Sequence, residues 1–134
     1  MLKDIPEYLV ENIAIAVLPT ENEIGEREWG VYIINLKDVA IENVLITSKG
    51  YGRHEGEEVR TSTLRHFIEI IPPQGYEKVE PIIETVFGLN NEYWVSFYIG
   101  SQIFERKFLF LPETISDEYL TNVPVMNQPG VVIK

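Results

Sequence analysis

Seven short apolar runs separated by polar turn residues constrain the fold of this 134-residue chain more than any other feature. Most of the runs are rich in Ile, Val, Phe, Tyr and Trp, the residues that pack well on a pleated sheet. Their spacing of about 10–18 residues is typical of an all-β sandwich and not of alternating strands and helices. The runs are Ile13–Leu18, Trp29–Leu36, Ile41–Ser48, Val59–Ile71, Tyr76–Val86, Tyr93–Ile99 and Ile103–Leu111.

The clearest local signal is a hairpin around Gly100-Ser101. Glycine adopts the positive φ that the first position of such a two-residue turn needs. This turn pairs Phe97 with Phe104. One face of the hairpin is then predicted to face the core, with Tyr93, Val95, Phe97, Phe104 and Phe108. Arg106 falls on the same face, which predicts either a sheet margin or a slipped register there. With the spacing of the runs, the hairpin predicts an immunoglobulin-like antiparallel β-sandwich of about seven strands.

Two of the runs, Ile13–Leu18 and Trp29–Leu36, are apolar on both faces. A strand with only one face in the core alternates between apolar and polar residues, so the second face of these runs must also be covered. The terminal segments and a second subunit are the two candidates for that cover.

The C-terminal segment, residues 112–134, contains too many apolar residues for a free tail. Val123–Met126 and Val131–Ile133 are its apolar stretches. Before them, Thr114 or Ser116 is suited to cap a short helical turn. We expect this segment to pack on the domain or on a partner chain.

The chain is short enough for one hydrophobic core, so residues 1–134 are expected to form a single β-sandwich domain. Residues 1–12 are predicted to hold one helical turn with Asp4 as its N-cap. The N-terminus has acids early and lacks the apolar core of a signal peptide, and no run is long enough to span a bilayer. We therefore expect a cytoplasmic protein that does not bind membranes.

Charge and composition exclude several classes of function. The net charge of −10 argues against a nucleic-acid partner, because phosphate binding needs an excess of cations. The absence of cysteine excludes disulfides, thiolate zinc sites and iron–sulfur clusters. The chain has no Gly-x-Ser-x-Gly nucleophile motif and no phosphate-binding glycine motif, and the acidic run Glu21–Glu28 lacks the spacing of a calcium loop. No catalytic residue, metal or cofactor is predicted.

Several distinctive sequence blocks are spread over nearly the whole chain. They are Val31–Asn35, Ser48–Gly52, Thr61–His66, Leu89–Val95, Val123–Met126 and Gly130-Val131. In these blocks the chain resembles a family of small uncharacterised bacterial proteins of about this length, some of which carry the label phenylalanyl-tRNA synthetase alpha subunit. The resemblance implies one compact β domain. It supplies no activity, because the chain matches no motif of a class II synthetase core and is acidic where tRNA would dock.

The segment from Lys49 to His66 gathers cations in an otherwise acidic chain. Guanidinium, imidazole and hydroxyl groups hold phosphate and carboxylate groups. One hypothesis is therefore a small-anion (phosphate or carboxylate) site that uses Arg53, His54, Arg60 and Arg65. The alternative is a solvated loop whose charges pair with the neighbouring glutamates.

Alternation along the fourth run places His66 on an aliphatic face, with Leu64 and Ile68. This position predicts a buried, hydrogen-bonded histidine. Arg65 then points outward among threonines, where an ion pair to a neighbouring strand is the expected contact. A β-bulge would exchange the two faces.

The second face of the predicted hairpin carries Trp94, Tyr98 and Ile103. If this face is exposed, it is a candidate interaction surface, because exposed aromatic area marks protein contacts. The alternative is that the C-terminal segment covers these side chains.

The expected function is that of a non-enzymatic interaction module. The apolar surfaces that need cover indicate self-association, as a homodimer through a two-faced strand or the final segment, or binding of an unknown protein partner. The small-anion site is the alternative function. An enzyme of an unrecognised class stays open, because a fold does not determine its chemistry.

Overall fold

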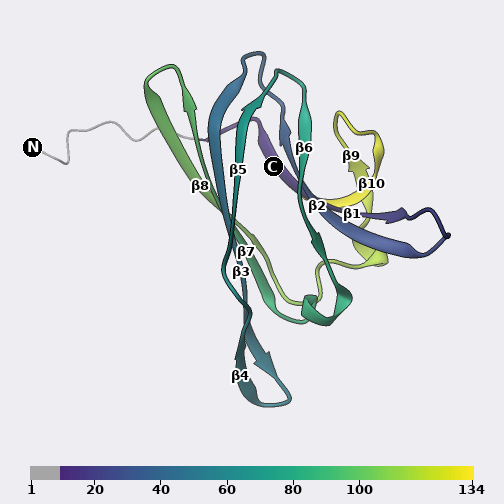
Figure 1. Ribbon diagram of the computed structural model, residues 1–134. Helices are drawn as coiled ribbons and strands as arrows, with labels where there is room; N and C mark the ends of the chain where they lie inside the picture. Colours follow the sequence, from purple (N-terminus) through teal and green to yellow (C-terminus); the bar gives the residue numbers. More distant parts are fainter. Residues whose placement is uncertain (1–9) are drawn as a thin grey trace, which may run out of the picture.

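The computed structural model describes residues 10–134, which form an all-β structure of two antiparallel sheets (Figure 1). The first sheet has the order β6 (Tyr76–Ile82), β2 (Arg27–Asn35), β1 (Ile13–Glu21), β10 (Gln128–Ile133) and β9 (Thr121–Val123). In the second sheet β3 lies between β7 and two shorter strands, β4 and β5, and β8 lies beyond β7. Their bounds are β3 (Ile41–His54), β4 (Glu57–Arg60), β5 (Leu64–Ile71), β7 (Asn90–Ile99) and β8 (Gln102–Phe110).

The described residues form ten strands, where the sequence predicted about seven. Two additional strands, β9 and β10, come from the C-terminal segment. Another arises because the run Val59–Ile71, predicted as one strand, is divided at Thr61. Thr61 Oγ1 accepts a hydrogen bond from the Gly50 amide at 2.7 Å, and the Thr61 amide donates to the Gly50 carbonyl at 2.9 Å. Both β4 and β5 pair with the same edge of β3, and this contact lies between them.

Among the described residues the helical structure is limited to two short 3₁₀ turns, η2 (Glu84–Val86) and η3 (Asp117–Tyr119). The second lies where the sequence predicted a helical turn, and its cap is Ser116, whose Oγ accepts from the Glu118 amide at 3.2 Å. The turn predicted around Asp4 lies outside the described residues.

The β7–β8 hairpin has the predicted register. Phe97 pairs with Phe104, and Gly100 in the turn has a φ of 60°. The predicted inner face lies in the main core between the sheets, where Tyr93, Val95, Phe97 and Phe108 are buried and Phe104 is partly buried. The register does not slip at Arg106. Its guanidinium lies 4.3 Å from the centre of the Phe108 ring and donates to the backbone oxygen of Lys134 at 2.9 Å.

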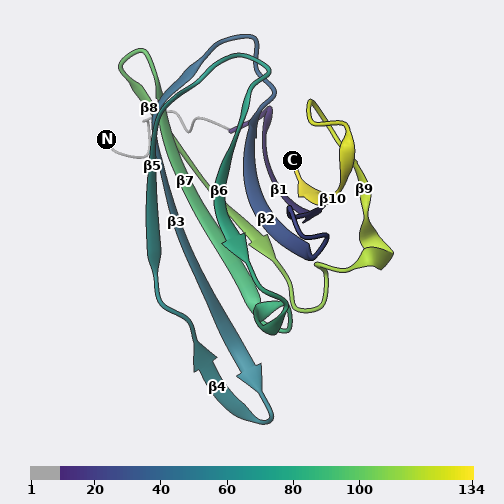
Figure 2. The same cartoon turned by 45° about the vertical axis from the view of Figure 1, so that its right-hand side comes forward.

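Strand β1 is buried on both faces, as its composition requires. One face contributes Ile13, Ile15 and Val17 to the main core. The other face contributes Ala14, Ala16 and Leu18 to a second cluster on the outside of the first sheet. Side chains of the C-terminal segment complete that cluster, namely Val123, Val125, Met126 and Val132. The segment returns beside β1 and pairs with it (Figure 2), so this segment supplies the cover that the sequence required.

Candidate functional site

The outer face of the second sheet is the first candidate site, because no segment among residues 10–134 covers it. It carries five large apolar side chains that expose 37–63% of their surface: Leu45, Phe67, Trp94, Tyr98 and Ile103. We call this the uncovered face. Trp94, Tyr98 and Ile103 were predicted from the sequence as an interaction surface, and Leu45 and Phe67 extend it across β3 and β5. The C-terminal segment, the alternative cover, lies on the other sheet.

Charged groups lie among these apolar side chains. Glu92 pairs with Lys49 at 3.6 Å and with Lys107 at 3.8 Å. The ammonium of Lys107 also lies 5.9 Å from the centre of the Trp94 ring. Tyr51 donates a hydrogen bond to Glu92 at 3.3 Å, and partial burial, together with the nearby Glu92 carboxylate, raises the pKa of Tyr51. Glu92 is thus neutralised by its neighbours on the same face.

The structure does not bring together the four residues of the predicted small-anion site. Arg53 and His54 lie in the β3–β4 hairpin, which projects beyond the body of the sandwich (Figure 1). Arg60 pairs across from Tyr51 on the same arm, and Arg65 lies on β5 opposite Thr47, four residues further along β3. At about 3.3 Å per residue, that separation is roughly 13 Å along the strand.

Acidic residues accompany the cations of this arm. Arg53 faces Glu58 in the ladder, and the imidazole of His54 lies 3.9 Å from the carboxylate of Glu55, with both side chains exposed. Arg65 forms no ion pair with any described residue, so the ion pair expected for it is not formed. Among the described residues of the projecting arm, only His54 and Glu55 lie within ion-pair distance, and the charged side chains of the arm are exposed as in a solvated hairpin.

A second candidate site is a polar cluster around Glu80 on β6, at the edge between the two sheets. The carboxylate is nearly buried, with 10% of the side chain exposed. Its Oε1 accepts from the Ser48 hydroxyl at 2.7 Å and lies 2.7 Å from His66 Nε2, and its Oε2 accepts from the Tyr93 hydroxyl at 3.2 Å. His66 is thus hydrogen-bonded, as predicted, and is half-buried.

A β-bulge turns Glu80 toward the interior. Val31 pairs with Glu80, whereas the next residue, Tyr32, pairs with Lys78, so Val79 is the additional residue in β6. Val31 faces the main core, and the residue opposite it points to the same side of the sheet. Bulges redirect side chains in this way, and they are frequent beside binding sites.

The hydrogen-bond order of the cluster differs from that of a hydrolase triad. In a triad the serine proton goes to an imidazole, which a carboxylate orients in turn. Here Ser48 donates directly to Glu80, and His66 contacts the same carboxylate oxygen. Burial, aided by the Glu80 charge, strongly raises the pKa of Tyr93, which keeps its phenol protonated as a donor. The cluster positions a carboxylate and does not activate a hydroxyl.

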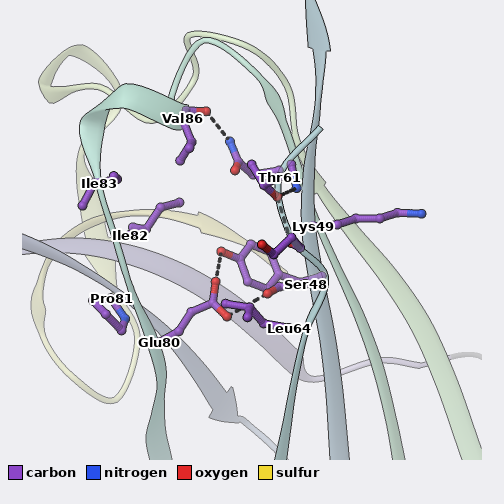
Figure 3. Close-up of a pocket in the computed structure, with 13 residues that line it drawn as sticks. Ser48, Lys49, Thr61, Leu64, Glu80, Pro81, Ile82, Ile83 and Val86 are labelled. Carbon is purple, nitrogen blue, oxygen red and sulfur yellow. Dashed lines mark hydrogen bonds between the residues drawn. The ribbon is translucent and has the colours of Figure 1, made fainter. Parts of the chain in front are cut away.

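The cluster forms the floor of a cleft of about 360 Å³ between the edges of the two sheets (Figure 3). Apolar side chains of β5, β6, η2 and the residue that joins β6 to η2 form much of its wall, namely Leu64, Pro81, Ile82, Ile83 and Val86. Lys49 lies at the rim, and its ammonium points away from Glu80 (Figure 3). The cleft thus has an apolar wall and a polar floor.

Neither a metal centre nor a known family defines these sites. Residues 10–134 contain no group of three or more His, Cys, Asp or Glu side chains that is arranged to hold a metal ion. The same residues include no helix with the length and hydrophobicity needed to cross a membrane. No family model matches the chain, and no curated protein matches it significantly. The resemblance to small bacterial proteins stays a prediction.

The sequence did not reveal Ser48, Glu80 and Tyr93 as one cluster. The three residues lie on three strands and share no motif. The one local sign is Pro81 after Glu80, because proline in a strand is found at edges and bulges. A proline that marks an edge strand does not by itself indicate that the neighbouring carboxylate points between the two sheets.

Proposed function

We propose that this protein is a non-enzymatic interaction module that self-associates as a dimer through its uncovered face. The observation that carries the proposal is the contiguous apolar surface on the outside of the second sheet. Exposed apolar patches of this kind mark protein contacts. Strand β1 and the C-terminal segment, which the sequence also suggested as contacts, already bury their apolar residues within the chain.

The strand register supports a continuous contact surface. One cross-strand row consists of Phe67, Leu45, Ser96 and Glu105, taken from β5 through β3 and β7 to β8. The adjacent row consists of Arg65, Thr47, Trp94 and Lys107. Tyr98 and Ile103 pair directly beside the first row. The apolar side chains are therefore neighbours across all four strands, with polar groups between them.

The charges that stay unpaired on this face favour a second copy of the same chain as the partner. Arg65 lies on the β5 edge and Glu105 on the β8 edge, and neither forms an ion pair with any described residue. A two-fold axis parallel to the strands places β5 of one copy over β8 of the other. Such an isologous contact places Arg65 over β8 of the second copy twice, with Glu105 one cross-strand row, about 7 Å along the strand, from the position directly opposite, which Lys107 occupies. Complementary charges of this kind set the orientation of an interface.

We also propose that the core is immunoglobulin-like. Strands β1, β2 and β6 face β3, β5, β7 and β8, and the chain passes between the sheets after β2, β5 and β6. A three-plus-four arrangement with such crossings supports this topology. In this description β9 and β10 are additions beside β1.

Sedimentation velocity over a range of concentrations tests the dimer. We expect a species of twice the 15.5 kDa chain mass at micromolar to millimolar concentration. Ile103→Asp places a charge in the apolar contact and should shift the equilibrium to monomer. Ile24→Asp is the matched control, because Ile24 is an exposed isoleucine in the β1–β2 loop, away from this face.

Charge reversal tests the orientation of the contact. Arg65→Glu and Glu105→Arg should each weaken the dimer, and the double variant should restore it. A chain that stays monomeric throughout the concentration range contradicts the proposal. A dimer that survives Ile103→Asp places the contact elsewhere.

A further inference from the structure

We infer that the cleft above Glu80 is a binding site for a small organic cation, in which an ammonium group meets the Glu80 carboxylate and an apolar body lies against the cleft wall. This site is separate from the uncovered face, and the inference does not depend on the proposed dimer. Four observations carry it: the construction of the floor, the use of its hydrogen-bond donors, the charge around the cleft, and the exposed apolar mouth.

The floor holds a carboxylate that the fold has taken out of water at a cost. A buried ionised carboxylate is unfavourable unless hydrogen bonds and a countercharge compensate it. The bulge at Val79 directs Glu80 inward, and Ser48, Tyr93 and His66 fix its position. An outward-facing glutamate on this edge strand would need none of these contacts. The arrangement is therefore a positioned acidic group at the base of a cleft.

The donors around the floor are already used. The hydroxyl protons of Ser48 and Tyr93 go to Glu80, and the Thr61 hydroxyl donates to the Ser62 carbonyl. The amide group of Asn91 donates to the carbonyls of Val86 and Leu89. A carboxylate accepts about four hydrogen bonds. Three groups contact Glu80, so the carboxylate can still accept a hydrogen bond, and of the hydroxyl and amide side chains that line the cleft only that of the exposed Ser62 has no partner among the described residues. A complementary ligand must bring the donor.

Charge selects the same class of ligand. The one lysine among the residues that line the cleft, Lys49, points away from the floor and pairs with Glu92. The chain as a whole carries a net charge of −10, which raises the local concentration of cations and repels anions. An ammonium hydrogen-bonded to a nearly buried carboxylate is one of the stronger polar contacts.

The mouth of the cleft is lined by aliphatic side chains that would contact the apolar part of the ligand. Leu64 and Ile83 expose 48% and 65% of their surface beside the opening, although both are aliphatic. The volume of about 360 Å³ is near the lower end of the roughly 300–1,000 Å³ typical of ligand pockets. A compact amine with one ring or a short alkyl chain matches this shape.

Benzylammonium, benzyl alcohol and benzoate are the probes for this site, because they share a ring and differ in charge. Titrations of the ¹⁵N-labelled full chain followed by NMR should show saturable shifts with millimolar benzylammonium at Ser48, Glu80 and Tyr93. Benzyl alcohol should bind at least about tenfold more weakly, the loss expected when a charged hydrogen bond is replaced. Benzoate should give no shifts at these residues.

Two variants keep the test decisive. Glu80→Gln should weaken benzylammonium binding at least about tenfold and leave benzyl alcohol binding nearly unchanged. Leu64→Trp fills the mouth, replaces none of the groups that contact Glu80, and should abolish binding of both probes. Leu111→Trp is its control, since Leu111 is an exposed leucine outside the cleft. Absence of saturable shifts with benzylammonium, or equal binding of all three probes, overturns the inference.

Discussion

The outer faces of the two sheets differ in composition and in cover. The first sheet presents small and aliphatic residues, Ala14, Ala16, Leu18 and Ile34, and the C-terminal segment of the same chain lies over them. The second sheet presents aromatic and aliphatic residues that alternate with charges and hydroxyls, and no segment among residues 10–134 covers it. The residue types on each face thus correspond to whether another segment among residues 10–134 covers that face.

Small residues permit a close approach that large ones prevent. A Cβ at Gly130 of β10 would lie 2.7 Å from Val123 Cγ2 and 2.8 Å from Leu18 Cγ. No atom but hydrogen fits at that position, so the cover packs as tightly as a protein core. The uncovered face has long side chains and two lysines, Lys49 and Lys107, that form ion pairs with Glu92. The C-terminal segment closes the first face, whereas no segment among residues 10–134 closes the second.

The strongest test of this contrast places the same charge on both faces. Val123→Asp buries a carboxylate among apolar side chains, because Val123 is fully buried in the second cluster. We expect the free energy of unfolding to fall by roughly 3–5 kcal/mol. Ile103→Asp on the uncovered face should cost about 1 kcal/mol or less in dilute, monomeric protein. Urea denaturation measures both values, and equal losses would remove the distinction between the faces.

A smaller effect should follow from adding one methyl group under the cover. Gly130→Ala forces Val123 and Leu18 apart and should lower the free energy of unfolding by about 1–3 kcal/mol. Gly88→Ala is the control, because the one heavy atom near its new Cβ is the end of the flexible Glu113 side chain, at 3.2 Å. Chemical denaturation compares the two variants. Wild-type stability for Gly130→Ala would show that β10 does not pack closely on β1.

The smallest effect concerns the ion pair that links β2 to the start of the cover. Arg27 forms a two-bond contact with Asp117 in η3, and its hydrogen bond lowers the pKa of Asp117 below the ordinary value of 3.8. A lowered carboxyl pKa stabilises the fold above the unfolded value, and the stabilisation is lost as pH falls through the folded pKa. Arg27→Gln should therefore reduce the melting temperature slightly at neutral pH and not in acid.

Salt provides the control for that experiment. Both side chains are largely exposed, so added salt should shrink the difference between Arg27→Gln and the wild type at neutral pH. Arg53→Gln removes an exposed arginine from the projecting arm and should show no comparable loss of stability. A difference that persists unchanged in acid would assign the effect of Arg27 to its packing over the Trp29 ring, 4.7 Å away.

The sequence was sufficient to predict those parts of the fold that interactions between nearby residues determine. The hairpin register follows from one glycine turn and a regular alternation of apolar residues, and both act over a few residues. The division of Val59–Ile71 was not predictable in this way. Thr61 and Thr63 are good strand residues, and a tertiary contact with Gly50 interrupts the ladder.

The candidate sites show the same limit. The exposed aromatic face was predicted because alternation on a hairpin places Trp94 and Tyr98 on one side. Glu80 was missed because Val79 precedes it in the same strand. Simple alternation therefore places the Glu80 side chain on the face of the sheet that does not carry the buried Val79. The bulge that reverses this orientation depends on the pairing with Val31 and Tyr32 in another strand. Long-range pairing, and not residue type, creates that site.

The pairing of β10 with β1 also has a consequence for synthesis. Strand β1 ends at Glu21 and its cover begins at Thr121, so about one hundred residues separate them. A ribosome adds about 5–20 residues per second, so Ala14, Ala16 and Leu18 wait roughly 5–20 s before their cover is made. During that interval the nascent chain presents an apolar strand face to the cell. Chaperone binding to ribosome-bound chains that stop before Thr121 should report this exposure.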